Sequence, residues 1–126
     1  VEAAAQRWKT EPARLVVGGR SLGGRMASMA VAEGAVAAAG LVLVSYPLHP
    51  PKKPETLRTA HLGDVTVPTL FVSGERDDFG TPGELRSAHR LVAGPVTASW
   101  IDGGRHELKR VGDHAEVARR VAAWLD

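Results

Sequence analysis

The sequence predicts an α/β fold with three layers, helix, sheet and helix, in which the sheet is mainly parallel. Short apolar runs alternate with segments of helical periodicity, in the order of one helix followed by four strand–helix pairs. Most of the apolar runs are continuous, as is typical of parallel strands that helices cover on both faces. Because no linker or internal repeat interrupts this order, we expect residues 1–126 to form a single domain.

Four segments have the character of strands. Three of them are continuous apolar runs, which favours central, doubly covered positions. The fourth mixes apolar and polar residues and therefore suits a position nearer an edge of the sheet. The four segments are residues 15–18, 41–44, 69–72 and 96–101.

Helices are expected between and around these strands. Residues 2–9 can form a short leading helix, and a helix over residues 22–33 can end at Gly34. The loop over residues 47–54 contains four prolines and no helical pattern. The helix over 22–33 places four apolar residues at helical spacing, namely Leu22, Met26, Met29 and Ala30.

Two further helices have recognisable starts. Thr81 is the expected N-cap of one, with Pro82 at its first position and Glu84 reaching back from its third. Asp113 is the expected cap of the last helix, with Glu116 in the same relation to it. Four apolar residues of that last helix are expected on one side: Val117, Val121, Trp124 and Leu125.

Composition excludes several classes of protein. With 44% hydrophobic and 24% charged residues, the composition is that of a globular and not a disordered protein. The longest apolar runs are short and interrupted, so none predicts a membrane span. It has no cysteine, which excludes disulfides and thiolate chemistry. Acidic and basic residues are interspersed, so we expect no nucleic-acid or membrane partner. We expect a cytoplasmic protein without a metal or other cofactor, since no metal cluster or phosphate-binding loop is present.

The first strand leads into a G-x-S-x-G turn, formed by Gly19, Ser21 and Gly23. Between a strand and a helix, such a turn holds the serine in a strained conformation, and its glycines allow the two elements to approach closely. The Ser21 hydroxyl is then exposed above the sheet as a nucleophile. The amide of Leu22, at the helix N-terminus, can stabilise an oxyanion. The alternative is a serine that only caps the helix.

An acid and a histidine follow two later strands on the same edge of the sheet. Asp77 follows the third strand and can orient an imidazole, although the adjacent Asp78 could take its place. His106 follows the last strand in a glycine-rich loop and is the preferred general base. The chain order serine, acid, histidine is one of the known orders for such a triad. Of the other histidines, His49 is expected to line the pocket, and His61 lies near the end of a helical stretch. His89 and His114 fall in predicted helices and are expected to face solvent or cap a helix.

Three segments carry a family resemblance: GGRSLGGRMAS, YPLHPPKKPETLRTAHL and LFVSGERDDFGTP. The chain resembles the α/β-hydrolase superfamily, in particular a dienelactone-hydrolase-like subgroup that includes testis-expressed and chromatin-complex proteins of animals. The resemblance covers nearly the whole chain. It implies Ser21 as nucleophile, Asp77 as acid, His106 as base and an esterase-like activity on a small molecule.

One departure from the resembled family is large. That family has about four further strands before the nucleophile strand, and they normally supply the second oxyanion-hole amide. We therefore expect the chain to be the C-terminal part of such a domain. The strand over residues 15–18 would otherwise form an exposed apolar edge, which a homodimer pairing across it could cover.

The sequence favours a serine hydrolase and leaves two alternatives open. One is a weak or inactive hydrolase-like binding or scaffold module, because we expect this chain to supply only one of the two oxyanion donors, and the loss of one donor costs about 10²–10³-fold in rate. The other is thioester or peptide chemistry instead of ester chemistry. The residues expected to contribute to a substrate pocket near Ser21 are Arg20, Tyr46, Leu48 and His49.

Overall fold

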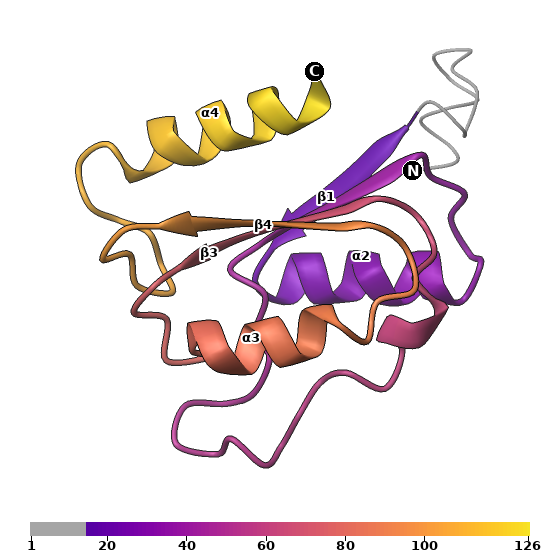
Figure 1. The fold of residues 1–126 in the computed structure, drawn as a ribbon, viewed down its shortest axis with the longest axis horizontal. Helices are drawn as coiled ribbons and strands as arrows, with labels where there is room; N and C mark the ends of the chain where they lie inside the picture. Colours follow the sequence, from indigo (N-terminus) through magenta and orange to yellow (C-terminus); the bar gives the residue numbers. More distant parts are fainter. Residues whose placement is uncertain (1–14) are drawn as a thin grey trace.

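The computed structural model describes residues 15–126 and contains the predicted helix–sheet–helix layers (Figure 1). Its four strands are all parallel and lie in the order β1-β2-β3-β4. The predicted fold class is therefore confirmed, while the helix expected over residues 2–9 lies outside the described residues. The strands are β1 (Val16–Arg20), β2 (Gly40–Val44), β3 (Thr69–Gly74) and β4 (Val96–Ile101).

Helices cover both faces of the sheet. Figure 1 shows α2 (Leu22–Ala32) and α3 (Pro82–His89) on one face and α4 (Asp113–Leu125) on the other. A single turn of 3-10 helix, η2 (Leu62–Asp64), lies between β2 and β3 in the sequence. In the described part of the chain, no helix has the length and apolar character needed to cross a membrane.

The two central strands are the most buried. All six residues of β3 are buried, whereas β4 is mostly exposed or half-buried along its length. The edge position expected for the 96–101 segment is thus confirmed. Strand β1 lies at the opposite end of the described sheet, where Val16 is 41% exposed. The homodimer expected to cover this edge stays a prediction.

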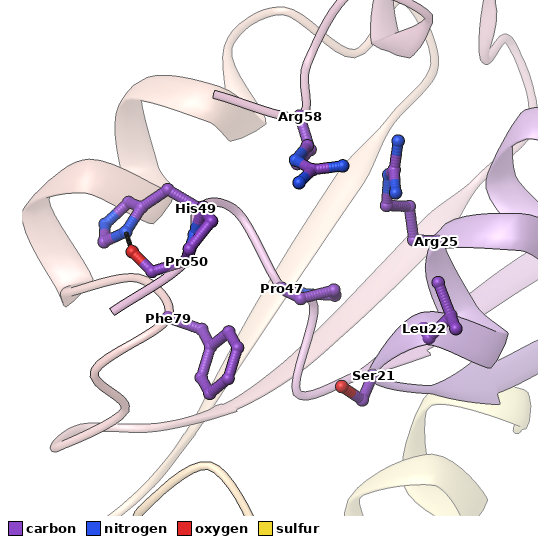
Figure 2. Close-up of a pocket in the computed structure, with 8 residues that line it drawn as sticks. All are labelled: Ser21, Leu22, Arg25, Pro47, His49, Pro50, Arg58 and Phe79. Atoms are coloured by element: carbon purple, nitrogen blue, oxygen red, sulfur yellow. Dashed lines mark hydrogen bonds between the residues drawn. The ribbon is translucent and has the colours of Figure 1, made fainter. Parts of the chain in front are cut away.

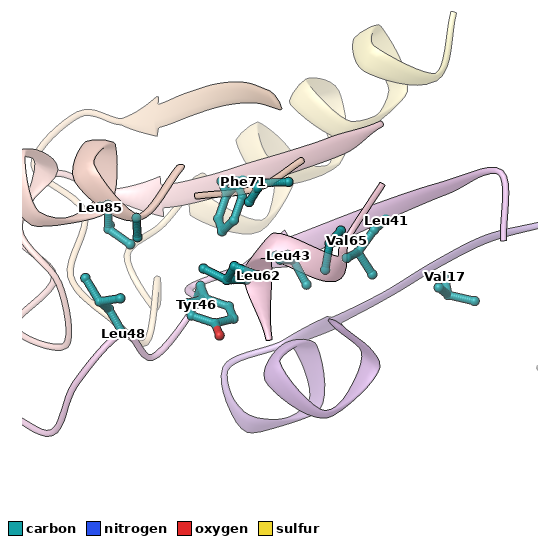
Figure 3. Close-up of a cluster of buried hydrophobic side chains, with 11 residues drawn as sticks. Val17, Leu41, Leu43, Tyr46, Leu48, Leu62, Val65, Phe71 and Leu85 are labelled. Atoms are coloured by element: carbon teal, nitrogen blue, oxygen red, sulfur yellow. The ribbon is translucent and has the colours of Figure 1, made fainter. Parts of the chain in front are cut away.

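Buried apolar side chains fill the space between the sheet and α2 and α3 (Figure 3). Within this cluster the rings of Tyr46 and Phe71 meet edge to face, with centroids 5.8 Å apart. A second, smaller cluster lies under α4 and includes Leu70 and Val72. Since burying one such side chain stabilises a fold by about 1.5–3 kcal/mol, the two clusters hold the three layers together.

The face of α2 that meets the sheet differs from the expected one. Gly24 and Ser28 are its buried residues, whereas Leu22 is 60% and Met26 54% exposed. The apolar spacing therefore identified the helix correctly but not the side that packs on the sheet. Small residues replace large ones on that side because β1 and α2 run very close together.

One predicted helix cap is confirmed and one is wrong. Thr81 and Glu84 form the expected capping box at the start of α3. Helix α4, however, is preceded by Gly112 in a left-handed conformation (φ 89°), and Asp113 makes no cap. Instead, its carboxylate accepts hydrogen bonds from the backbone and guanidinium of Arg110, both at 3.0 Å. In α4, Leu125 is 55% exposed, whereas three expected residues pack on the sheet: Val117, Val121 and Trp124.

The register of the sheet brings the strand ends to one edge. Arg20 pairs with Val44, Val44 with Val72, and Gly74 at the end of β3 with Ile101 at the end of β4. The loops that carry Ser21, Asp77 and His106 all begin at these ends. This is the edge where open α/β sheets place their functional groups.

Candidate active site

Ser21 occupies a strained turn between β1 and α2. Its backbone has φ 51° and ψ −123°, a region that residues with a side chain rarely adopt. The Ser21 amide donates to the Val44 carbonyl at 2.8 Å, which ties the turn to the neighbouring strand β2. The turn thus lifts the Ser21 hydroxyl above the carboxyl edge of the sheet, as expected for a nucleophile elbow.

Two glycines permit this turn, and one of them is not in the G-x-S-x-G pattern. A Cβ on Gly19 would lie 2.5 Å from the Gly23 carbonyl carbon, and a Cβ on Gly24 would lie 2.7 Å from the Gly19 oxygen. A Cβ on Gly23 would meet no described atom within 4 Å. The expected close approach is real, but it depends on Gly19 and Gly24, so the role given to Gly23 was wrong.

His106 lies beside Ser21 although 85 residues separate them in the sequence. Its Nε2 is 2.8 Å from the Ser21 Oγ, which is hydrogen-bonding distance. The Ser45 hydroxyl donates to the His106 carbonyl at 2.8 Å and so fixes the backbone of the loop that carries His106. The ring of Phe79 stacks on the imidazole with centroids 3.9 Å apart. The imidazole is therefore held in one orientation toward Ser21.

Asp77 completes the chain of hydrogen bonds. Its two carboxylate oxygens lie 3.0 and 2.8 Å from His106 Nδ1, and the residue is only 2% exposed. The amide of Phe79 donates to the same carboxylate at 2.8 Å and fixes its rotation. Asp78 is exposed, so of the two acids named from the sequence it is Asp77 that meets the imidazole.

The acid loop and the histidine loop pack against each other through glycines. A Cβ on Gly74 would lie 2.2 Å from the Gly104 oxygen, so backbone fills the space that a side chain would need. The Arg76 amide donates to that same Gly104 carbonyl at 2.7 Å. The glycine-rich sequence after β4 is thus required for close contact between the loops that carry Asp77 and His106.

The amide of Leu22 has no hydrogen-bond acceptor in the described part of the chain. As the first residue of α2, Leu22 has a backbone N–H without an acceptor inside the helix. Within residues 15–126 it donates to no acceptor. A free N–H next to Ser21, at the positive end of a helix, is suited to bind a developing oxyanion.

A pocket of about 230 Å³ opens beside Ser21. Figure 2 shows its residues arranged around a hollow above the end of the sheet. They come from the start of α2, from the proline-rich loop after β2 and from the loop after β3. The lining residues are Ser21, Leu22, Arg25, Pro47, His49, Pro50, Arg58 and Phe79.

A comparison with protein families agrees with this geometry. The profile of the family described as alpha/beta hydrolase domain matches residues 1–122, which is nearly the whole chain. The chain belongs to this family. Parallel strands covered by helices, with a serine at a strained strand–helix turn, are the architecture expected of an α/β hydrolase.

Solved α/β hydrolases share its fold at low sequence identity. An alpha-beta serine hydrolase homologue from Coxiella burnetii superposes with a TM-score of 0.74 at 16% identity, over 99% of this chain and 54% of that one. For a monoacylglycerol lipase from Paleococcus ferrophilus the TM-score is 0.78 at 14% identity, over 98% and 71%. For dienelactone hydrolase from Anabaena variabilis it is 0.65 at 22% identity, over 86% and 47%. The chain spans about half the length of the Coxiella protein.

Four residues were expected from the sequence to contribute to a pocket near Ser21. In this α/β hydrolase, one of them lines that pocket and the other three lie elsewhere. His49 lines the pocket, whereas Tyr46 and Leu48 are buried in the core, and the Tyr46 hydroxyl donates to the Arg58 carbonyl at 2.6 Å. Arg20 donates to the Glu107 carbonyl and lines a separate apolar hollow beside α4.

His49 forms a fixed part of the pocket wall. Its Nδ1 lies 2.8 Å from the Pro50 carbonyl and its Nε2 lies 2.9 Å from Glu84 Oε1. Burial alone would lower its pKa, but the hydrogen bonds to Glu84 and Pro50 outweigh it and raise the pKa. The contacts to Glu84 and Pro50 also fix the orientation of the ring.

Five residues that line the pocket were not named as site residues from the sequence: Arg25, Pro47, Pro50, Arg58 and Phe79. Arg25 lies four residues after Ser21 in α2, and this spacing places it on the same side of the helix one turn later. This spacing could have identified Arg25 as a pocket residue from the sequence. Arg58 and Phe79 lie in loops, where no periodicity indicates which way a side chain points.

Proposed function

We propose that this chain carries the catalytic triad of a serine hydrolase that cleaves carboxylic esters of small molecules. The observation that carries the proposal is the continuous hydrogen-bonded chain from Ser21 through His106 to Asp77. The strained backbone of Ser21 supports it, since strain of this kind is retained where function requires it. Esterase and lipase structures among the solved neighbours support the choice of an ester.

In the first half of the reaction, Ser21 Oγ attacks the ester carbonyl carbon. His106 Nε2 accepts the hydroxyl proton, while its Nδ1–H donates to Asp77 and stabilises the imidazolium that forms. The carbonyl oxygen becomes an oxyanion, and the Leu22 amide donates to it. When the tetrahedral intermediate collapses, the bond to the leaving oxygen breaks, and the imidazolium returns its proton to the departing alcohol.

In the second half, water replaces the alcohol. His106 accepts a proton from water, whose oxygen attacks the acyl carbon and forms a second oxyanion beside Leu22. The bond to Ser21 Oγ then breaks, the serine regains its proton, and the carboxylic acid leaves. The free enzyme is restored with no change in oxidation state.

Hydrolysis of a short p-nitrophenyl ester such as the butyrate tests the proposal. We expect the full chain to release p-nitrophenol, and Ser21→Ala to lower kcat to the background rate. Ser87→Ala is the matched control, because Ser87 lies on the exposed surface of α3 and bonds only to the Gly83 carbonyl. Equal activity in the Ser21→Ala variant would refute the proposal. An inactive but folded wild-type chain would favour a binding or scaffold module.

A further inference from the structure

Two arginines converge on the pocket beside the nucleophile. Arg25 extends from α2 and Arg58 from the loop after the prolines, and both line the same hollow as Ser21. Figure 2 shows their guanidinium groups on the same side of the pocket, facing one another. Two like charges that share one small pocket repel each other, and an anion between them would relieve that repulsion.

The described part of the pocket offers these arginines no carboxylate partner. None of its lining residues is an Asp or Glu, and neither arginine takes part in an ion pair among residues 15–126. Two acids that contact residues of the site are already bonded, since Glu84 binds His49 and Asp77 binds His106. The Nε of Arg25 is buried and has no hydrogen-bond partner among residues 15–126, which is uncommon for a buried donor.

The backbone holds both arginines in place. Arg25 sits in the second turn of α2, a helix packed on the sheet by Gly24 and Ser28. The amide of Arg58 donates to the Leu48 carbonyl at 2.8 Å, and its carbonyl accepts from Tyr46 at 2.6 Å. Because the backbone groups of Arg58 are already bonded, the loop that carries it does not have to become ordered when an anion binds.

The local electrostatics agree with a cationic site. Burial lowers the pKa of His61, and the charge of Arg25 lowers it further, whereas Glu33 and Asp64 raise it by smaller amounts. His61 Nε2 lies 2.7 Å from the hydroxyl of Ser28, which is one turn after Arg25 in the same helix. Among the charged neighbours that act on His61, Arg25 has the largest effect.

We propose that Arg25 and Arg58 bind an anionic group of the substrate, so that the preferred substrates are esters carrying a separate carboxylate or phosphate. This inference rests on the proposed function, because it assigns a substrate class to the same pocket. The anion is not consumed: Arg25 and Arg58 hold it while Ser21 and His106 act on the ester carbonyl. Because the volume of the pocket is about 230 Å³, the expected substrate is a small ester.

A pair of matched esters tests the proposal by catalysis. The mono-4-nitrophenyl ester of adipic acid keeps a free carboxylate, and methyl 4-nitrophenyl adipate is its neutral counterpart. The readout is the ratio of kcat/KM for the two esters, each corrected for the rate with Ser21→Ala, since a general loss of activity lowers both. We expect the charged ester to be preferred, and the ratio to fall about 10- to 100-fold in Arg25→Gln or Arg58→Gln. Arg119→Gln, on the exposed side of α4, is the charge-matched control.

A binding measurement tests the same site without catalysis. Calorimetry with Ser21→Ala protein should detect adipate or inorganic phosphate, and the stronger of the two identifies the anion. We expect affinity to fall about 10-fold or more when Arg25→Gln is added. If neither anion binds, or if binding is unchanged by both arginine substitutions, the proposal is overturned. If the anion binds but no ester is cleaved, the anion site stands and the proposed hydrolase function fails.

Discussion

The Asp77 carboxylate turns both of its oxygens toward His106 Nδ1, at 2.8 and 3.0 Å. With Nδ1 facing an acceptor, the imidazole keeps its proton on that nitrogen, and Nε2 is left to accept the proton of Ser21. The pairing therefore selects the tautomer that a general base requires. The Phe79 amide, bonded to the same carboxylate, prevents the group from rotating away.

Asp77→Asn is expected to preserve the fold but to lower kcat by about 10⁴-fold, as the loss of the orienting carboxylate does in other triads. The amide can present an N–H to Nδ1 and so favour the wrong tautomer. Steady-state hydrolysis of a p-nitrophenyl ester measures the effect. Asp78→Asn is the matched control, because Asp78 is exposed, and its kcat should stay within a factor of two or so of wild type. An equal loss in both variants would contradict the assignment of Asp77.

The two glycines after the nucleophile should respond in opposite directions. Gly24→Ala places a Cβ 2.7 Å from the Gly19 oxygen, and we expect it to lower the free energy of unfolding by about 1–3 kcal/mol. Gly23→Ala meets open space in a helix and should raise it by up to about 1 kcal/mol. Urea unfolding of both variants measures the difference. Equal destabilisation would show that the close contact between β1 and α2 is not as described.

His89 makes stability fall at acid pH. Burial lowers its pKa to about 4, with a smaller contribution from the charge of Arg86. The unfolded chain binds a proton near pH 6.5 and the folded chain only near pH 4. Protonation of His89 therefore leaves the free energy of unfolding unchanged above pH 6.5 and lowers it as the pH falls toward 4. After allowance for partial exposure of the ring, the decrease is about 2 kcal/mol.

Replacing that imidazole with a ring that does not titrate tests this account. His89→Phe keeps an aromatic ring against Phe71, whose centroid is 4.2 Å from that of His89. It also removes the buried Nε2 that has no hydrogen-bond partner among the described residues. We expect the free energy of unfolding to depend less on pH between 6.5 and 4 in the variant. If the variant keeps the pH dependence of the wild type, groups other than His89 are responsible for it.

Glu84 connects the pocket to α3. One of its oxygens accepts from His49 Nε2 at 2.9 Å and from the Thr81 amide at 3.0 Å. Glu84→Ala should destabilise the protein by about 1–2 kcal/mol through the lost cap, and it should lower the pKa of His49 because its main stabilising partner is gone. NMR titration of the His49 ring measures the shift, with the exposed Glu55→Ala as control. An unchanged His49 pKa would show that the ion pair does not form in solution.

Local patterns explain why much of the fold could be predicted. The apolar runs and the Thr81–Glu84 cap are readable without tertiary information, because period and capping chemistry act within a few residues. The position of Ser21 was predictable for the same reason, since its glycine-bounded turn is local. The meeting of Asp77 and His106 could be anticipated only because parallel strands end at one edge.

Side-chain direction after a strand was not predictable. Tyr46 follows β2 at the expected edge, yet Ser45 adopts φ 53° and the Tyr46 ring packs on Phe71 in the core. Arg20 precedes the nucleophile directly, but strand residues alternate faces, and its side chain lies on the α4 side of the sheet. Arg25 and Arg58 line the same pocket because of the path that the loop before Arg58 takes, and no periodicity in the sequence predicts that path.

Reaction with a fluorophosphonate probe tests the central claim most directly, because the probe forms a covalent bond only with an activated serine. After incubation of the folded full chain, intact mass and peptide mapping locate the adduct. The account predicts one adduct, on Ser21, formed in wild-type and Ser87→Ala protein and absent from Ser21→Ala. No adduct on the folded wild-type chain, or labelling that persists in Ser21→Ala, would contradict it.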